Sequence, residues 1–267
     1  MAIFLAGQPG SGKTILRNHL LETMQLRNAS VVINTDDLRE YHPAYKELSA
    51  KKEGFADASY LVNPDSVIWA NRLREDAIKK KVNIIFDTTL GGDPAIYSQT
   101  MTELKKEGYI LFLAVLVVKR EMSRLGVHLR YESQLAEKGA GRFVGIEVHD
   151  RNYSNLIKNI EVITNLVDFE KAAVYQRTIY QYYKQTKNKE LSPIFDFNKE
   201  NQRNKLPVQD LIKAIENERT RDWTRSEKDY LKSRVATVNQ QIKARGGNPD
   251  AFLNDIKRIT DIIDFKG

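Results

Sequence analysis

Residues suited to holding a phosphate stand near the start of the chain, where the run GQPGSGKT begins at Gly7 and matches G-x-x-x-x-G-K-[ST]. Its glycines allow backbone N–H groups to curl around a phosphate at the positive end of a helix. Lys13 would neutralise the β- and γ-phosphates, and the Thr14 hydroxyl would be a Mg²⁺ ligand. The residues predicted to bind ATP or GTP are Gly7, Gln8, Pro9, Gly10, Ser11, Gly12, Lys13 and Thr14.

Carboxylates follow two predicted strands. A kinase needs one near the end of a strand, placed to orient the acceptor hydroxyl and receive its proton. Asp36 and Asp37 follow the expected strand 30–34. Because Asp37 is expected to cap the next helix, Asp36 is the better candidate base. Asp87 closes the expected strand 82–86 in the manner of a Walker-B acid and should face the same pocket; the alternative is a turn acid without a ligand.

Two arginines, Arg130 and Arg142, lie on or just after the helix predicted over 121–137. Two guanidinium groups that converge on a transferring phosphoryl group would stabilise its spread charge. The competing interpretation is that both are solvated surface residues, as most arginines are.

The first two hundred residues alternate β-rich runs with amphipathic stretches, which predicts a parallel α/β sheet flanked by helices. The expected strands are Ile3 to Ala6, Ser30 to Asn34, Val82 to Phe86 and Tyr109 to Val118. Asn63-Pro64 and Asp93-Pro94 predict two helix starts, and Gly108 a helix end. Further helices are expected over 121–137 and 147–166.

The pattern changes towards the C-terminus. Ala172 to Arg177 and Thr178 to Tyr183 are expected to form a terminal hairpin or edge strands. A boundary near residue 200 divides a kinase-like domain, 1–200, from a C-terminal extension, 201–267. Apolar residues at helical spacing, interrupted by Gly246-Gly247-Asn248-Pro249, predict that this extension is a helical hairpin. Its expected role is to buttress the domain or to mediate an interaction.

Composition limits the remaining chemistry. The 267 residues are 41% hydrophobic, which supports a folded chain, and no apolar run reaches the roughly 18 residues of a membrane span. The start lacks the basic region of a signal peptide, so a cytoplasmic location is expected. There are no cysteines, and the four histidines have no metal-ligand spacing. The net charge of +7 suits an anionic ligand such as a nucleotide, but equally nucleic acid.

A phosphate loop alone does not separate a GTPase, an ATPase motor and a small-molecule kinase. No Asn-Lys-x-Asp stretch for reading guanine is present, which favours a kinase that transfers phosphate to an alcohol group of a small acceptor. The alternative is a nucleotide-dependent nucleic-acid-binding or polynucleotide-kinase-like protein. It is kept open because the hairpin is basic, with Lys228, Lys232, Arg234, Lys243 and Arg245.

The order of these residues resembles the zeta toxin family, the kinase halves of bacterial toxin–antitoxin pairs. The resemblance covers roughly residues 3–185. After the phosphate loop, the matching residues are Asp36, His42-Pro43, an acid followed by Thr89, Arg130-Tyr131-Glu132, Arg142 and His149-Asp150.

This resemblance implies a kinase that phosphorylates the sugar of UDP-N-acetylglucosamine, with ATP and Mg²⁺ and with an antitoxin protein as partner. It implies that Lys13 holds the phosphates, Asp36 is the base, Arg130 and Arg142 clamp the transferred group, and Thr89 contacts the nucleotide sugar. Two positions depart from the family pattern. Asp87-Thr88-Thr89 replaces the family's usual Glu-Gly-Thr, and Gly91 replaces an arginine of the family's sugar site. The acceptor is therefore expected to be UDP-N-acetylglucosamine or a related nucleotide sugar.

Overall fold

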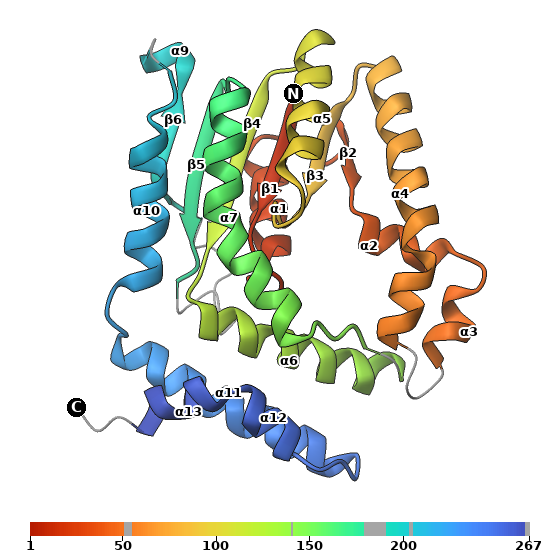
Figure 1. Ribbon diagram of the computed structural model, residues 1–267, viewed down its shortest axis with the longest axis vertical. Coiled ribbons are helices and arrows are strands. Elements are labelled where there is room, and N and C mark those ends of the chain that lie inside the picture. Colours follow the sequence, from red (N-terminus) through yellow and green to blue (C-terminus); the bar gives the residue numbers. More distant parts are fainter. Residues whose placement is uncertain (51–54, 140, 179–190, 203–204, 265–267) are drawn as a thin grey trace.

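The chain folds around a mixed β-sheet (Figure 1). The computed structural model describes residues 1–50, 55–139, 141–178, 191–202 and 205–264. Over these residues the strands form one six-stranded sheet in the order β2-β3-β1-β4-β5-β6. Strands β1 to β5 are parallel, and β6 pairs antiparallel with β5. The predicted parallel α/β sheet flanked by helices is confirmed, with one antiparallel strand added at its edge.

The central strands are continuous apolar runs because helices cover both faces of the sheet. All residues of β1 and β4 are buried. The strands are β1 Ala2–Ala6, β2 Ser30–Ile33, β3 Asn83–Asp87, β4 Leu111–Val117, β5 Lys171–Gln176 and β6 Pro193–Asn198. The four strands expected in the first half of the chain are confirmed to within two residues at each end.

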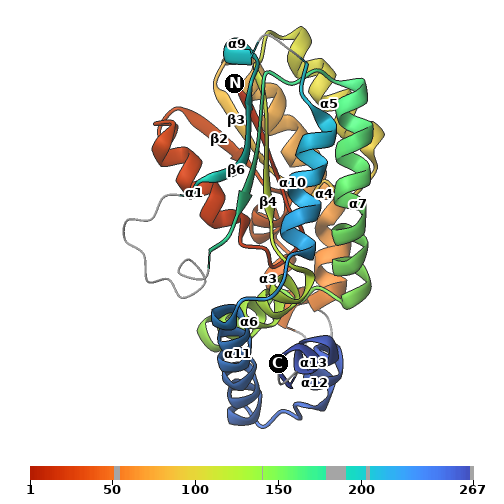
Figure 2. The same ribbon diagram turned by 90° about the vertical axis from the view of Figure 1, so that its left-hand side faces the viewer.

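One face of the sheet is covered by α1 (Lys13–Thr23), and the other by α4 (Phe55–Lys79), α5 (Pro94–Lys106), α7 (Ile146–Leu166) and α10 (Val208–Thr220) (Figure 2). The side chains of Leu16 and Leu20 on α1 pack into one core cluster, and those of Leu156 and Ile160 on α7 pack into the larger cluster of the opposite face. The remaining helical segments are α2 Thr35–Leu38, η1 Arg39–Tyr41, α3 Tyr45–Ala50, α6 Arg120–Lys138, α9 Lys199–Gln202, α11 Arg225–Ala244, α12 Asp250–Asp255 and α13 Lys257–Asp264.

One predicted helix start is wrong. Asn63-Pro64 does not begin a helix, since α4 runs through it with Pro64 inside. A proline costs a helix one hydrogen bond, and here the 25-residue helix continues on both sides of it. In contrast, Asp93 does cap α5, accepting a hydrogen bond from the N–H of Ala95 at 2.9 Å. The strand expected over Ala172 to Arg177 is confirmed as β5, which pairs antiparallel with β6, and residues 179–183 of the expected second strand lie outside the described residues.

The C-terminal helices form the predicted hairpin, whose second arm is divided between α12 and α13. Both views place α11 beside α6, at the carboxyl-end edge of the sheet (Figures 1 and 2). Arg245 clamps Glu132 of α6 through two hydrogen bonds of 3.0 and 3.1 Å. Within the predicted extension, however, α10 packs on the sheet, where Leu211 and Ile215 are part of the large core. The hairpin after α10 is therefore the part that lies away from the sheet.

Among the described helices, none is long and apolar enough to cross a membrane.

Candidate active site

The phosphate loop connects β1 to the start of α1, as the sequence predicts. Helix α1 begins after Gly12 without any side-chain cap, so its first N–H groups are open to an anion. Gly10 has a φ of 77°, and a Cβ there would meet the Ser123 carbonyl oxygen of α6 at 2.0 Å. Only glycine therefore allows this loop to pass under α6 in this conformation.

The side chain of Lys13 folds back over the phosphate loop. Its Nζ donates a hydrogen bond to the Gly7 carbonyl oxygen at 2.9 Å. Burial lowers the pKa of the Lys13 ammonium, while the nearby carboxylates of Asp87 and Asp36 act in the opposite direction. Its charge is thus placed between the loop and two acids, where the terminal phosphates of a nucleotide would lie.

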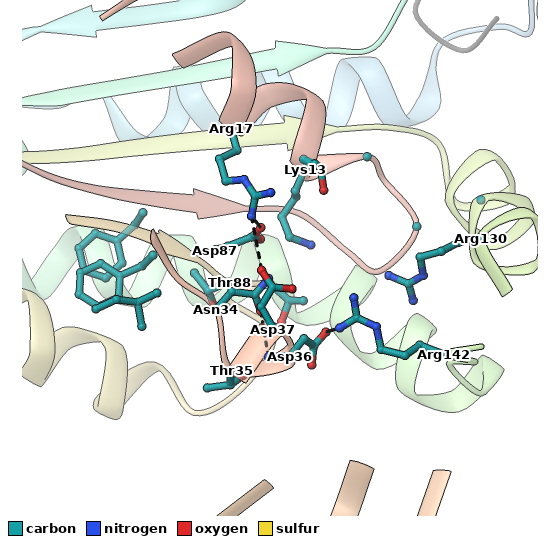
Figure 3. Close-up of a pocket in the computed structure, with 18 of the residues that line it drawn as sticks. Lys13, Arg17, Asn34, Thr35, Asp36, Asp37, Asp87, Thr88, Arg130 and Arg142 are labelled. Atoms are coloured by element: carbon teal, nitrogen blue, oxygen red, sulfur yellow. Dashed lines mark hydrogen bonds and ion pairs between the residues drawn. The ribbon is translucent and has the colours of Figure 1, made fainter. Parts of the chain in front are cut away.

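A cavity of about 1120 Å³ opens above the loop and gathers most of the predicted site residues. Figure 3 shows the side chains of Lys13, Arg130 and Arg142 directed toward the space above Asp36. The predicted site residues that line this cavity are Gly10, Gly12, Lys13, Thr14, Asp36, Asp87, Thr89, Arg130 and Arg142. The other predicted loop residues do not line it, and the side chains of Gln8 and Ser11 are buried.

The two neighbouring aspartates occupy the first turn of α2. Asn34 caps this helix, because its Oδ1 accepts a hydrogen bond from the Asp36 N–H at 2.9 Å. The prediction that Asp37 is the cap is therefore wrong: the extended residue before the helix holds that role. Asp36 forms ion pairs with Arg39 at 2.7 Å and with Arg142 at 3.2 Å. Asp37 lies within 3.7 Å of Arg17, and burial raises the pKa of its carboxyl group.

Asp87 ends β3, and the sheet register sets its position. It pairs with Leu5 of β1, just before the phosphate loop. Its side chain is only 8% exposed and accepts a hydrogen bond from Arg17 Nη1 at 3.4 Å. Thr14 and Asp87 line the same cavity. A hydroxyl and a carboxylate are oxygen donors of the kind that Mg²⁺ prefers together with phosphate oxygens and water, so these residues fit a Mg²⁺–nucleotide complex.

Arg130 and Arg142 stand in the cavity wall rather than on the outer surface. Burial and the charge of Arg142 lower the pKa of Arg130, against the pull of Asp36. The Nε atoms of both arginines are buried and have no hydrogen-bond partner among the described residues. Two desolvated guanidinium groups in one cavity favour an anionic ligand between them, because such a ligand would offset their mutual repulsion.

A buried chain of polar side chains holds the phosphate loop from behind. Gln8 Nε2 donates to the Ser123 hydroxyl at 3.2 Å, and Ser123 Oγ lies 2.8 Å from His149 Nε2. His149 Nδ1 is 2.9 Å from Asp150, which in turn pairs with Arg120. His149 is fully buried. This Ser–His–Asp series therefore has no access to a substrate, and it fixes the loop against α6 and α7 instead.

Gly91, where the family resemblance calls for an arginine, does not line the cavity. A Cβ at this position would meet Asn152 of α7, with its Oδ1 at 2.0 Å and its Cα at 2.9 Å. The neighbouring backbone is fastened to the same helix, as Asn155 donates to the Gly91 carbonyl at 3.1 Å. An arginine here would need a different spacing between this loop and α7.

Several cavity residues were missed in the sequence. Arg17 stands one helical turn after Lys13, and this spacing is the one local signal that could have found it. Arg74 on α4 donates to the Thr100 hydroxyl at 3.2 Å and lies 3.7 Å from Glu103. Arg177 follows β5, and its guanidinium lies 2.9 Å from where a Cβ of Gly12 would stand. Further cavity residues come from α11, with Tyr230, Arg234, Thr237 and Gln241.

The parallel sheet, the glycine-rich loop between β1 and α1, and the acids that face it define the fold of the P-loop kinases. The model of the zeta toxin family matches residues 1–188. The chain therefore belongs to the zeta toxin family.

Two relatives of the chain are named as toxins. "Toxin zeta" of Enterococcus hirae is 31% identical over 197 residues, which cover 72% of this chain and 66% of that protein. "Toxin PezT" of Streptococcus pneumoniae is 29% identical over 182 residues, covering 66% of this chain and 68% of that protein. The matched part thus spans about two thirds of the length of each relative.

Two solved structures share the fold. A chain from the PezAT chromosomal toxin–antitoxin system of Streptococcus pneumoniae has a TM-score of 0.67 and 23% identity, and the match covers 91% of this chain and 86% of that chain. A chain from the AvrRxo1-ORF1:-ORF2 complex with ATP has a TM-score of 0.56 and 13% identity, covering 98% of this chain and 80% of that chain. Both matches extend beyond residue 188 to the C-terminal helices, because each covers more than nine tenths of this chain.

Proposed function

We propose that this protein is an ATP-dependent kinase that transfers the γ-phosphoryl group to a hydroxyl of a nucleotide sugar, UDP-N-acetylglucosamine or a related acceptor. One observation carries the proposal. The Asp36 carboxylate faces Lys13 and the phosphate loop across one cavity, with the Arg142 guanidinium 3.2 Å from it. A carboxylate in that position can receive a proton from a hydroxyl as the hydroxyl oxygen attacks the γ-phosphorus.

The residues around this carboxylate have separate roles in the transfer of the phosphoryl group. The loop amides and Lys13 hold the β- and γ-phosphates. Arg130 and Arg142 stabilise the charge that spreads over the equatorial oxygens as the bond to the leaving ADP oxygen breaks. Thr14 and Asp87 would hold Mg²⁺, which would supply positive charge to the phosphates of the nucleotide. Asp36 then carries the proton of the acceptor hydroxyl.

The acceptor side of the cavity favours an anionic molecule. Beyond Asp36, the cavity is lined by Arg74 and Asn71 of α4, together with Thr89 and Tyr97. Arg74 comes from a different element than the arginine that the family resemblance calls for at position 91. A guanidinium there suits a diphosphate, and the polar groups around it suit the hydroxyls of a sugar.

The comparisons support the donor and the partner. Binding of ATP is the expectation for a phosphate loop, and the AvrRxo1 structure, which shares the fold, is described with ATP. The relatives are named as toxins, and the PezAT chain belongs to a toxin–antitoxin system. We extend this to an antitoxin as the protein partner of the present chain.

The kinase is tested with purified protein, Mg²⁺, ATP and a panel of UDP-sugars, with mass spectrometry to detect a gain of one phosphoryl group. The wild type should phosphorylate at least one UDP-sugar, and Lys13→Ala should not. Expression in a growing bacterium should arrest growth or cause lysis, and Asp36→Asn should be harmless. Turnover by Lys13→Ala at the wild-type rate would refute the assignment of the phosphate loop.

The nucleic-acid alternative loses part of its support in the structure. Of the basic residues in the hairpin, Arg245 is paired with Glu132, and Arg234 lines the cavity. Lys232 and Lys243 are exposed, which is ordinary for a solvated helix face. A strongly salt-dependent shift of an oligonucleotide, in the absence of phosphorylated UDP-sugar, would reverse this preference.

A further inference from the structure

The helix α11 has two stripes that face different parts of the molecule. Leu231, Val238 and Ile242 are buried in a core cluster with α6. The second stripe, one residue earlier at each turn, lines the cavity of the phosphate loop. It consists of Tyr230, which also belongs to the core cluster, and of Arg234, Thr237 and Gln241. This spacing of four, three and four residues places all of them on one side of the helix, so the side that is not apolar is also turned inward.

The order of the strands indicates which end of a nucleotide would meet this stripe. Asp36 follows β2, while Arg177 follows β5 on the opposite side of β1 and lies against Gly12. A triphosphate whose γ-phosphoryl faces Asp36 must therefore leave the loop on the side of β4 and β5. The stripe of α11 begins at that side, since Tyr230 packs with Val118 and Met122 just beyond β4.

The chemistry of the stripe suits a nucleoside. The guanidinium of Arg234 stands 5.5 Å from the centroid of the Tyr230 ring, and both groups offer flat surfaces to a base. Thr237 and Gln241 add a hydroxyl and an amide that can pair with base edges or ribose hydroxyls. Gln241 Oε1 is buried and has no hydrogen-bond partner among the described residues. A buried acceptor of this kind is costly until a donor meets it.

The stripe is held rigidly enough to shape a binding wall. Arg245, one turn beyond Gln241, pairs with Glu132 of α6, which is almost completely buried. At the other end, Arg221 pairs with Glu227 in the first turn of α11 at 2.6 Å. Arg124 of α6 pairs with Asp255 of α12 on the far side of the hairpin. Both ends of α11 are thereby fixed against the domain that holds the phosphate loop.

We infer that α11 forms the wall of the nucleoside pocket, and that the C-terminal hairpin binds the base and ribose of the donor nucleotide rather than only buttressing the domain. This inference rests on the proposed donor site at the phosphate loop. It assigns the phosphates to residues 7–14 and the nucleoside to a segment more than two hundred residues later in the chain.

The test compares ATP with inorganic tripolyphosphate, which has the phosphates without the nucleoside. The variant Arg234→Ala/Gln241→Ala removes two members of the stripe. The matched control Lys232→Ala/Gln240→Ala makes the same kind of change at two exposed positions of the same helix. Dissociation constants are measured by calorimetry on the full chain, and circular dichroism and the thermal midpoint show that each variant is folded.

The stripe variant should bind ATP about tenfold or more weakly while its affinity for tripolyphosphate changes by less than about twofold. The control should match the wild type for both ligands. An unchanged ratio of the two affinities in the folded stripe variant would overturn the inference, whether both ligands are weakened equally or neither is. Failure of the wild type to bind either ligand would instead refute the phosphate loop as a donor site, so the two failures are distinguishable.

Discussion

Arg74 provides a sharp test of acceptor recognition, because it lines the cavity but belongs to none of the motifs found in the sequence. Its side chain is 19% exposed and reaches across from α4 to α5, where Nη1 donates to the Thr100 hydroxyl. Glu103 stands 3.7 Å away and is itself 43% exposed. These contacts orient the guanidinium without using all of its five donors, which leaves some of them for a ligand in the cavity.

The size of the effect follows from those contacts. Arg74→Ala removes one hydrogen bond and one partly exposed ion pair, which should lower the free energy of unfolding by about 1 kcal/mol. A charge-assisted hydrogen bond to an acceptor phosphate contributes about 1.5–3 kcal/mol. Its loss should therefore raise KM for the acceptor about ten- to a hundredfold, with kcat and KM for ATP nearly unchanged. Arg74→Lys should recover only part of the loss, since lysine lacks the planar fork.

Steady-state kinetics with UDP-N-acetylglucosamine varied at saturating ATP measures this effect, and urea unfolding measures the stability. Arg72→Ala is the matched control, because Arg72 lies on the same helix and is exposed. If Arg74→Ala raises KM for ATP instead, or changes no kinetic constant, the arginine has no role toward the acceptor. Gly91→Arg, which would restore the arginine of the family pattern, is not a useful opposite test, since its Cβ would stand within 3 Å of Asn152.

Three further predictions concern the carboxylate, the clamp and the buried histidine. Asp36→Asn should lower kcat about 10²-fold or more while ATP still binds, whereas the matched Asp37→Asn should not; a reversed result would move the base to Asp37. Arg142→Ala, like Arg130→Ala, should lower kcat more than it raises KM for ATP, and an effect on KM alone at both positions would dismiss the clamp. Burial holds the pKa of His149 below its ordinary value of 6.5, so the stability that depends on its neutral form is present above about pH 6.5 and is lost as the pH falls through the lower pKa of the folded state. Urea unfolding at about pH 7.5 and 5.5 should show a smaller acid-induced loss in His149→Gln than in the wild type, and an equal loss would assign the effect to other groups.

The sheet and the phosphate loop could be predicted because their signals are local. A central strand such as β4 must be apolar at every position, and the loop needs its glycines in sequence. The Asn63-Pro64 prediction failed because the local start signal competes with a long helix that continues on both sides of the proline. The edge strand β6 was missed because its short apolar run begins with Pro193 and lies within the Lys- and Asn-rich residues 185–206, a composition typical of a loop.

Local patterns predict the carboxylates of the cavity, which follow strands, whereas the assignment of Arg130 and Arg142 depends mainly on the family resemblance. Asp87 ends β3 and Asp36 lies in the first helical turn after β2, and the carboxyl ends of parallel strands meet at one edge of the sheet. Arg74 and Gln241 instead lie on amphipathic helices, where polar residues are normally solvated. Nothing in the local sequence indicates that these two polar side chains turn inward, because that depends on which elements pack across from them.

Close packing between α6 and the phosphate loop explains why the parts of this site depend on one another. Gly126 of α6 stands over Gly10, and a Cβ at Gly126 would meet the Gly10 carbonyl oxygen at 2.3 Å. The same helix carries Arg130 toward the cavity and packs on α11 along its other side. A displacement of α6 would therefore move the loop, the clamp and the α11 stripe together. For this reason a substitution at Gly126 should impair the binding of ATP and of tripolyphosphate alike, whereas changes confined to the α11 stripe should separate the two ligands.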